Sequence, residues 1–278
     1  MLRVAILLTV HNRRAKTLRC LENCWHQIDG MKADGKYSFT VYLVDDGSTD
    51  GTSEAVAEQF PQTVLLRGDG SLFWNQGMRL AWSKAAEDGQ DFYLWINDDT
   101  YMNEGALAAL MENSEFLRHK AVIVGTAANS AGVITYGGRN KARKLMTPDP
   151  VIPVPCYLFN GNLVLVPKSV YDVVGNLDPV YHHSFGDFDY GVRARKHGID
   201  CVLAPGILAV CDRDHGLEKW RDIAYPLKER FRYLRSPKGR PPKEQFIYDY
   251  RESGVVWAVF HALSTFFKVL FPKRKNNG

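Results

Sequence analysis

Short runs of apolar residues without polar alternation recur through the first half of the chain. Such runs are typical of strands that are covered on both faces of a sheet. They predict four buried strands, at residues 4–10, 39–44, 63–66 and 92–96. Between the strands, apolar residues recur at helical spacing, as in Leu18, Leu21, Trp25 and Ile28. Strands that alternate with helices indicate right-handed βαβ units, and hence an α/β fold with a mostly parallel sheet and flanking helices.

Each of the four predicted strands ends in polar residues. The residues at these ends are His11, Asn12, Asp45, Asp46, Arg67, Gly68, Asp98 and Asp99. Because ligands of open parallel sheets bind beyond the carboxyl ends of the strands, these residues predict a binding site on one edge. Ordinary polar loops would explain each strand end separately. The adjacent carboxylates Asp98 and Asp99 predict a site for a hard cation, although Asn-Asp-Asp is also common turn chemistry.

The second half of the chain carries two further features. Asn160, Gly161 and Asn162 interrupt an apolar stretch, which predicts a bulge or the close approach of a ligand. Farther on, Asp187 and Asp189 stand at the start of a predicted helix. Acidic residues at that place are also explained by capping and by the helix dipole.

Composition indicates a globular protein with one large domain or two smaller ones. The chain has 278 residues, of which 45% are hydrophobic and 24% charged. Its five cysteines lack dense spacing, which indicates a reducing, cytosolic compartment. The first apolar run is too short for a signal peptide. No Gly-x-Gly-x-x-Gly follows the first strand and no Walker loop occurs, so a dinucleotide Rossmann site and a P-loop are not expected.

The C-terminal part is basic and ends in an apolar stretch at 255–271, although the net charge of the chain is only +4. Polar residues within this stretch form one helical stripe: His261, Ser264, Thr265 and Lys268. About 17 residues span roughly 26 Å as a helix, short of the ~30 Å hydrocarbon core of a bilayer. The pattern predicts a helix that lies in the membrane interface. The alternative is a helix packed on the protein's own core or on a second copy in a homodimer.

Five short motifs resemble those of one enzyme family. They are LTVHNR (8–13), VDDGSTD (44–50), NDDT (97–100), NGN (160–162) with GNLD (175–178), and GDFDYGVRA (186–194). In this order, over residues 1 to about 217, they resemble the family-2 glycosyltransferases of GT-A fold, which build bacterial surface polysaccharides. A further stretch, GSLFWNQGM (70–78), resembles a subgroup that includes rhamnosyltransferases.

The resemblance implies a nucleotide site at the strand ends. The residues that would line it are Thr9, His11, Asn12, Asp46, Arg67 and Asp98. Asp46 would contact the pyrimidine or ribose, and Arg67 would flank the base. Asp99 would hold Mg²⁺ or Mn²⁺ on the donor diphosphate, with His215 near the metal or the diphosphate. Asn97 replaces the first Asp of the simplest family motif, which leaves the cation with one protein carboxylate and more water.

The resemblance also implies a general base and residues that contact the sugar or the acceptor. Asp187 would take the proton from the acceptor hydroxyl, and one displacement with one base inverts the anomeric configuration. The sugar- or acceptor-binding residues would be Trp74, Asn75, Asn160, Gly161 and Asn162. Gly186 replaces the family's usual Glu, which removes a negative neighbour that would raise the pKa of Asp187.

The expected protein is an inverting, metal-dependent glycosyltransferase. Its donor would be a UDP- or dTDP-sugar, and its acceptor a saccharide or lipid-linked saccharide. Residues 1–217 would form the GT-A domain, with a nucleotide-binding half at 1–125 and an acceptor half at 126–217. Residues 218–278 would form a basic, amphipathic helical extension. The enzyme would work in the cytoplasm or on the inner face of the cytoplasmic membrane, without a nucleic acid partner.

Two other functions are compatible with the same fold. A sugar-nucleotide nucleotidylyltransferase would carry a Gly-rich signature with Arg and Lys after the first strand, and residues 10–14 are not that. A non-catalytic carbohydrate-binding module would explain the departures at Asn97 and Gly186. The joint presence of Asp99, Asp187 and His215 favours the enzyme over this module.

Overall fold

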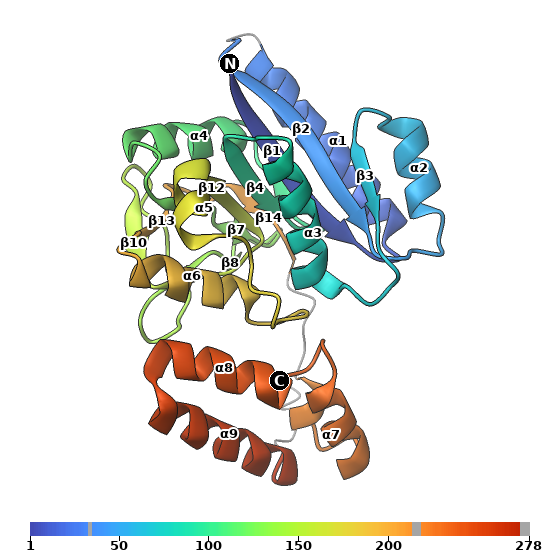
Figure 1. The fold of residues 1–278 in the computed structure, drawn as a ribbon, viewed down its shortest axis with the longest axis vertical. Coiled ribbons are helices and arrows are strands. Elements are labelled where there is room, and N and C mark those ends of the chain that lie inside the picture. Colours follow the sequence, from blue (N-terminus) through green and yellow to red (C-terminus); the bar gives the residue numbers. More distant parts are fainter. Residues whose placement is uncertain (33–34, 213–217, 273–278) are drawn as a thin grey trace.

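A computed structural model describes residues 1–32, 35–212 and 218–272 (Figure 1). Its central sheet contains β1 Leu2–Val10, β2 Tyr37–Asp45, β3 Val64–Arg67, β4 Phe92–Ile96, β6 Val122–Val124, β10 Val154–Cys156, β12 Leu163–Pro167 and β13 Cys201–Leu203. The strand order is β10-β13-β6-β12-β4-β1-β2-β3. All four strands expected from the apolar runs are present, which confirms the predicted α/β class.

Strands β3, β2, β1 and β4 run parallel to one another, so their carboxyl ends lie on one edge of the sheet. Strand β12 is antiparallel to both of its neighbours, β4 and β6. Leu163, the first residue of β12, pairs with Ile96, the last residue of β4. The segment that precedes β12 therefore reaches the same edge as the segment that follows β4.

Helices cover both faces of the sheet, which explains why its strands show no polar alternation. Val4, Ile6 and Leu8 of β1 belong to the core on one face, and Ala5 and Leu7 to the core on the other. The first core includes residues of α1 Arg14–Met31, α2 Thr52–Gln59 and α4 Ala106–Phe116. The second includes residues of α3 Phe73–Glu87, α5 Lys168–Val174 and α6 Gly186–Lys196. The result is a three-layer arrangement.

An aromatic cluster fixes α6 against the middle of the sheet. The rings of Trp82 on α3 and Trp95 on β4 have centroids 5.0 Å apart. Tyr190 on α6 lies 5.4 Å from Trp82 and 5.2 Å from Trp95. Edge-to-face and tilted aromatic pairs of this kind add to the energy of burial. The cluster thus positions the start of α6 close to the edge where β4 ends.

Two smaller sheets continue the chain beyond the main one. One contains β5 Tyr101–Met102, β14 Ala209–Val210, β7 Ala127–Ala128 and β8 Ile134–Tyr136, and the other contains β9 Gly138–Arg139 and β11 Leu158–Phe159. The turn at Asn160, Gly161 and Asn162 joins β11 to β12, which belong to different sheets. The interruption of the apolar stretch is therefore a change of sheet rather than a bulge within one strand.

The C-terminal helices form a separate layer below the α/β part (Figure 1). They are the short η2 Lys219–Arg221, α7 Leu227–Arg235, α8 Pro242–Ser253 and α9 Val255–Leu270. Helix α8 packs against α6, with the rings of Phe185 and Tyr248 stacked at 5.3 Å. Arg251 adds ion pairs to Asp178 and Asp189, each 2.9 Å long. Among the described residues, no helix combines the length and the apolar character needed to cross a bilayer.

Helix α9 turns part of its polar stripe toward the protein. His261 Nδ1 lies 3.0 Å from Asp249 Oδ1 of α8, and Gln245 Nε2 of α8 donates to Thr265 Oγ1 at 3.0 Å. The opposite face is apolar and about half-exposed or more, with Val256, Trp257, Phe260, Leu263 and Phe267. The other side of α9 packs on α8 and α7, where Ala258 and Val269 are completely buried. The helix therefore packs on the protein, as one alternative expected, while its apolar face stays uncovered in the described part of the chain.

Candidate active site

Hydrogen bonds lock together the loops that follow β1 and β2. His11 Nδ1 lies 2.6 Å from the carbonyl oxygen of Asp46. The Asn12 amide donates to Ser48 Oγ at 2.8 Å, and Asn12 Oδ1 accepts from the Thr49 amide at 2.7 Å. Asn12 has a φ of 51°, a left-handed conformation that asparagine adopts more readily than most residues. The structure thus brings His11, Asn12 and Asp46 together in one rigid pair of loops.

Asp46 organises the segment that leads into α3. Its buried carboxylate accepts hydrogen bonds from the amides of Gly70 at 2.8 Å, Leu72 at 3.2 Å and Phe73 at 2.9 Å. The resemblance implied that Asp46 contacts the pyrimidine or ribose. Here both carboxylate oxygens accept hydrogen bonds inside the protein, so Asp46 shapes the loop. Its contact with the pyrimidine or ribose stays a prediction.

Thr9 and Arg67 lie at the same edge in different surroundings. Thr9 is half-buried near the end of β1 and faces Gly77 of α3. A Cβ at Gly77 would come within 2.1 Å of Thr9 Oγ1, so the close packing of α3 on β1 requires glycine there. Arg67 ends β3, is exposed, and stands next to Asp45 in the strand register. Its guanidinium is accessible to a ligand bound at this edge.

Arg13 bridges the two carboxylates at the end of β4. Nη1 of Arg13 lies 3.0 Å from Asp98 Oδ1, and Nη2 lies 2.6 Å from Asp99 Oδ2. The side chain of Asp98 is 4% exposed, against 27% for Asp99. Burial raises the pKa of Asp98 to about 7; the charge of Arg13 opposes this rise and the charge of Asp99 adds to it. The sequence analysis did not identify Arg13 as a site residue. Arg13 belongs to the first motif, but nothing in the sequence indicates that its side chain reaches the carboxylates after β4.

The chemistry at the end of β4 fits a hard cation. Asp98 and Asp99 offer carboxylate oxygens, and Mg²⁺ is often held by one or two carboxylates together with substrate phosphates and water. The buried Oδ2 of Asp98 has no hydrogen-bond partner. Within the described residues, no three metal-binding side chains gather in one place. His215, which was expected near the metal, lies outside the described residues.

Asp187 is the second residue of α6 and points back toward β12. Its Oδ2 accepts from the Gly161 amide at 2.9 Å, and its Oδ1 accepts from the Phe188 amide at 2.8 Å. Burial raises the pKa of this carboxyl, whereas the two main-chain hydrogen bonds lower it. Each oxygen keeps a further lone pair with which it can accept a proton or a hydroxyl hydrogen bond. A carboxylate with a raised pKa is suited to general base catalysis.

A chain of contacts links Asp187 to the end of β4. A Cβ at Gly161 would lie 2.7 Å from Trp74 and 3.3 Å from the Cβ of Asp187, so the turn must be glycine to fit between them. Trp74 Nε1 donates to Asn97 Oδ1 at 2.8 Å. The Asn97 amide in turn donates to the carbonyl of Asn162 at 3.2 Å. Protein side chains, those of Trp74 and Asp187, come close to Gly161 here. The close approach of a ligand at this turn stays a prediction.

Asn75 and Asn160 are held by other parts of the protein. Asn75 is completely buried, and its Nδ2 donates to the carbonyls of Asp178 at 2.9 Å and Tyr181 at 2.8 Å. Asn160 Oδ1 accepts from Arg139 Nε at 3.1 Å. Asn75 was expected to contact the sugar or the acceptor. Its complete burial gives it a positioning role instead, because it ties the start of α3 to the segment before α6.

Comparison with known families distinguishes between the three functions that the sequence left open. The profile of glycosyl transferase family 2 matches residues 5–163, which include both carboxylates of β4 and the Gly161 turn. The chain belongs to this family. A family-2 glycosyltransferase is a sugar-transferring enzyme, which confirms the resemblance and favours it over the nucleotidylyltransferase and the non-catalytic module.

Relatives of this family-2 glycosyltransferase include a named enzyme and several solved structures. The N-acetylglucosaminyl-diphospho-decaprenol L-rhamnosyltransferase of Mycobacterium tuberculosis is 24% identical over 206 residues, which cover 63% of this chain and 67% of the relative. S. aureus TarS 1-349 has the same fold, with a TM-score of 0.59 and 14% identity over 97% of this chain and 71% of that one. The mannosyltransferase PcManGT from Pyrobaculum calidifontis, solved with GDP-Man and Mn²⁺, has a TM-score of 0.54 and 18% identity over 98% and 76%.

Proposed function

We propose that this enzyme is an inverting, metal-dependent glycosyltransferase that moves a sugar from a UDP- or dTDP-sugar to a saccharide or lipid-linked saccharide in surface polysaccharide synthesis. One observation carries the proposal. The carboxylate pair Asp98 and Asp99 ends β4, and the turn at Gly161 holds the carboxylate of Asp187 at the same edge of the sheet. A donor bound at this edge would present its diphosphate to the pair and its sugar to the base.

Residues at the strand ends would bind the nucleotide-sugar donor. In this proposal the nucleotide lies over the loops of His11 and Asn12, with Arg67 beside the base. Asp98 and Asp99 would hold Mg²⁺ or Mn²⁺, which supplies Lewis-acid stabilisation of the departing diphosphate. Because burial raises the pKa of Asp98 to about 7, cation binding has to compete with a proton at neutral pH.

The elements after β11 would bind the acceptor and activate its hydroxyl group. Asp187 takes the proton of the acceptor hydroxyl as that oxygen attacks the anomeric carbon. The hydrogen bond from the Gly161 amide fixes the carboxylate, so the base needs no reorientation when the acceptor arrives. Trp74 lies against Gly161 and offers an indole ring on which a sugar can stack. A single displacement of this kind inverts the anomeric carbon.

The relatives support the choice of substrates. The mycobacterial relative is named as a rhamnosyltransferase that acts on a lipid diphosphate sugar, and TarS 1-349 has been solved with UDP-GlcNAc. We infer a pyrimidine nucleotide donor and a lipid-linked acceptor for this chain. Residues 1–217 would be the catalytic domain, with the nucleotide half at 1–125 and the acceptor half at 126–217. Residues 218–278 would bring the enzyme to the cytoplasmic face of the membrane.

Calorimetry with UDP and dTDP tests the donor site directly. The wild type should bind one of these nucleotides more tightly when Mn²⁺ is present. Asp99→Ala should lose this metal-dependent gain, because it removes the more exposed carboxylate of the pair. Asp29→Ala, which removes an exposed carboxylate on α1, is the matched control and should bind like the wild type. If the Asp99 variant keeps the full Mn²⁺ effect, the cation is not held at β4.

A further inference from the structure

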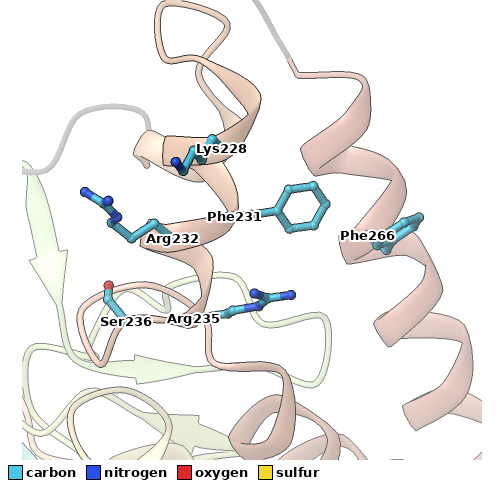
Figure 2. Close-up of a pocket in the computed structure, with 6 residues that line it drawn as sticks. All are labelled: Lys228, Phe231, Arg232, Arg235, Ser236 and Phe266. Carbon is cyan, nitrogen blue, oxygen red and sulfur yellow. The ribbon is translucent and has the colours of Figure 1, made fainter.

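A cavity of about 650 Å³ opens between α7 and α9, outside the candidate active site. Figure 2 shows the side chains that line it: Lys228, Phe231, Arg232, Arg235, Ser236 and Phe266. In the figure, Phe231 and Arg235 extend from α7 in the direction of α9. Lys228, Arg232 and Arg235 are four and three residues apart, which makes them neighbours on the surface of α7. Arg232 extends away from α9 in the figure, whereas Arg235 extends toward it.

The cavity is strongly positive. In the part of the chain that the structure describes, no ion pair is formed by Lys228, Arg232 or Arg235, and all three are exposed. Glu229, the acidic residue in the first turn of α7, lines a smaller neighbouring cavity, to which Arg232 and Ser236 also belong. Three unbalanced cations within two helical turns favour an anion with several oxygens, and the guanidinium groups suit a phosphate in particular.

The wall of the cavity next to α9 is aromatic. The ring centroids of Phe231 and Phe266 are 5.9 Å apart. From Phe266, the apolar face of α9 continues along the surface over Trp257, Phe260, Leu263, Phe267 and Phe271, each half-exposed or more. Since an aromatic side chain carries roughly 200 Å² of surface, the four half-exposed rings in this set alone leave about 400 Å² uncovered. A patch of that size is as large as the largest on a typical monomer, and such patches are often functional.

We propose that this cavity binds the phosphate headgroup of an anionic membrane lipid, whose acyl chains lie against the apolar face of α9. The inference rests on the proposed function, in which the acceptor is carried by a membrane lipid. It adds a defined phosphate site to the general attraction between the basic C-terminal part and an anionic membrane. The juxtaposition of cations and an apolar face matches the two ends of such a lipid. A second copy is the weaker occupant, because a twofold dimer through this face would bring two sets of unbalanced cations together.

Co-sedimentation of the full chain with vesicles tests the site. The vesicles contain phosphatidylcholine alone or phosphatidylcholine with phosphatidylglycerol, and no nucleotide sugar is present. The variant Lys228→Gln/Arg232→Gln/Arg235→Gln should bind the phosphatidylglycerol vesicles roughly 100-fold more weakly than the wild type, since each cation near an anionic surface contributes about fivefold. Binding to phosphatidylcholine alone should change little. Melting temperatures of both proteins check that the variant is folded.

A matched variant distinguishes binding at a defined site from an effect of net charge alone. Lys120→Gln/Lys141→Gln/Lys196→Gln removes three exposed lysines outside the cavity and changes the charge by the same amount. It should keep most of the binding. Equal losses in the two variants, or no loss in the first, would overturn the proposal. Binding of inorganic phosphate without binding to phosphatidylglycerol vesicles would also overturn it, since the site would then serve a free anion. A wild-type dimer that Phe266→Ser converts to monomers would overturn it too. Because no donor is used, failure of the proposed transfer reaction leaves these outcomes unchanged.

Discussion

Gly186→Ala is a small change with a large expected effect. Gly186 is the first residue of α6 and precedes the candidate base, Asp187. A Cβ at this position would lie 1.8 Å from Oδ1 and 2.8 Å from Cγ of Asn75. Atoms cannot approach that closely, so either the Asn75 side chain or the start of α6 has to move. Asn75 thus fills the space that any side chain at position 186 would need.

The cost of the clash follows from what holds Asn75. Its amide nitrogen donates to the carbonyls of Asp178 and Tyr181, and it is completely buried. Turning the side chain away would break both hydrogen bonds, each worth about 1 kcal/mol. Moving α6 instead would overpack the interior at about 1–3 kcal/mol. We expect Gly186→Ala to lower the free energy of unfolding by about 2–4 kcal/mol, or roughly 3–7 °C in melting temperature for a chain of this length.

Thermal unfolding of four proteins measures this effect: the wild type, Gly186→Ala, Asn75→Ala and the double variant. Asn75→Ala removes the obstacle, so the second substitution should cost little once the first is present. Gly30→Ala is the matched control, because a Cβ at Gly30 of α1 meets nothing within 4 Å. The reasoning is refuted if Gly186→Ala melts like the wild type, or if it costs as much without Asn75 as with it.

Three other substitutions test the carboxylates. Asp187→Asn should keep UDP affinity but lower the transfer rate by ~100-fold or more, and wild-type turnover would move the base elsewhere. Asp189→Asn should instead lower the melting temperature, because Asp189 is buried in ion pairs with Arg193 and Arg251; an unchanged melt with lost activity would reverse the two roles. Burial raises the pKa of Asp98 from 3.8 to about 7, so its contribution to stability is present below the lower value and lost as pH rises through the higher. Without a cation, melting temperatures of the wild type should therefore fall between about pH 4 and 7 more steeply than those of Asp98→Asn, and equal slopes would contradict the raised pKa.

The sheet and its functional edge could be predicted because they depend on local pattern. A strand covered on both faces has to be apolar throughout, and β4 forms at the residues expected, 92–96. Parallel strands then place the polar residues that follow them on one edge. Asp98 and Asp99 could be assigned to that edge from their positions in the sequence alone.

The rest depends on contacts between distant segments, which local pattern does not encode. Arg13 follows β1 but pairs with carboxylates 85 and 86 residues away. Asn75 has an amide side chain of the kind that can bind a sugar. Only the structure shows that this side chain is buried under α6. The sequence pattern of α9 indicated a polar face and an apolar face, but it did not indicate which of them packs against the protein. That choice is made by Gln245 and Asp249 of α8, polar partners that the helix pattern does not reveal.

The place of β12 in the sheet decides where this chain can be divided. Strand β12 lies between β4 and β6 and pairs with both, although it comes from the predicted acceptor half. A fragment that stops at residue 125 would leave one side of β4 without its ladder, and the bare edge would consist of Phe92–Ile96, which are buried and apolar. Such edges add strands from other molecules. The nucleotide half produced by itself would therefore be expected to aggregate, and any chimera that exchanges acceptor segments within the family must carry β12 along with the core that it completes.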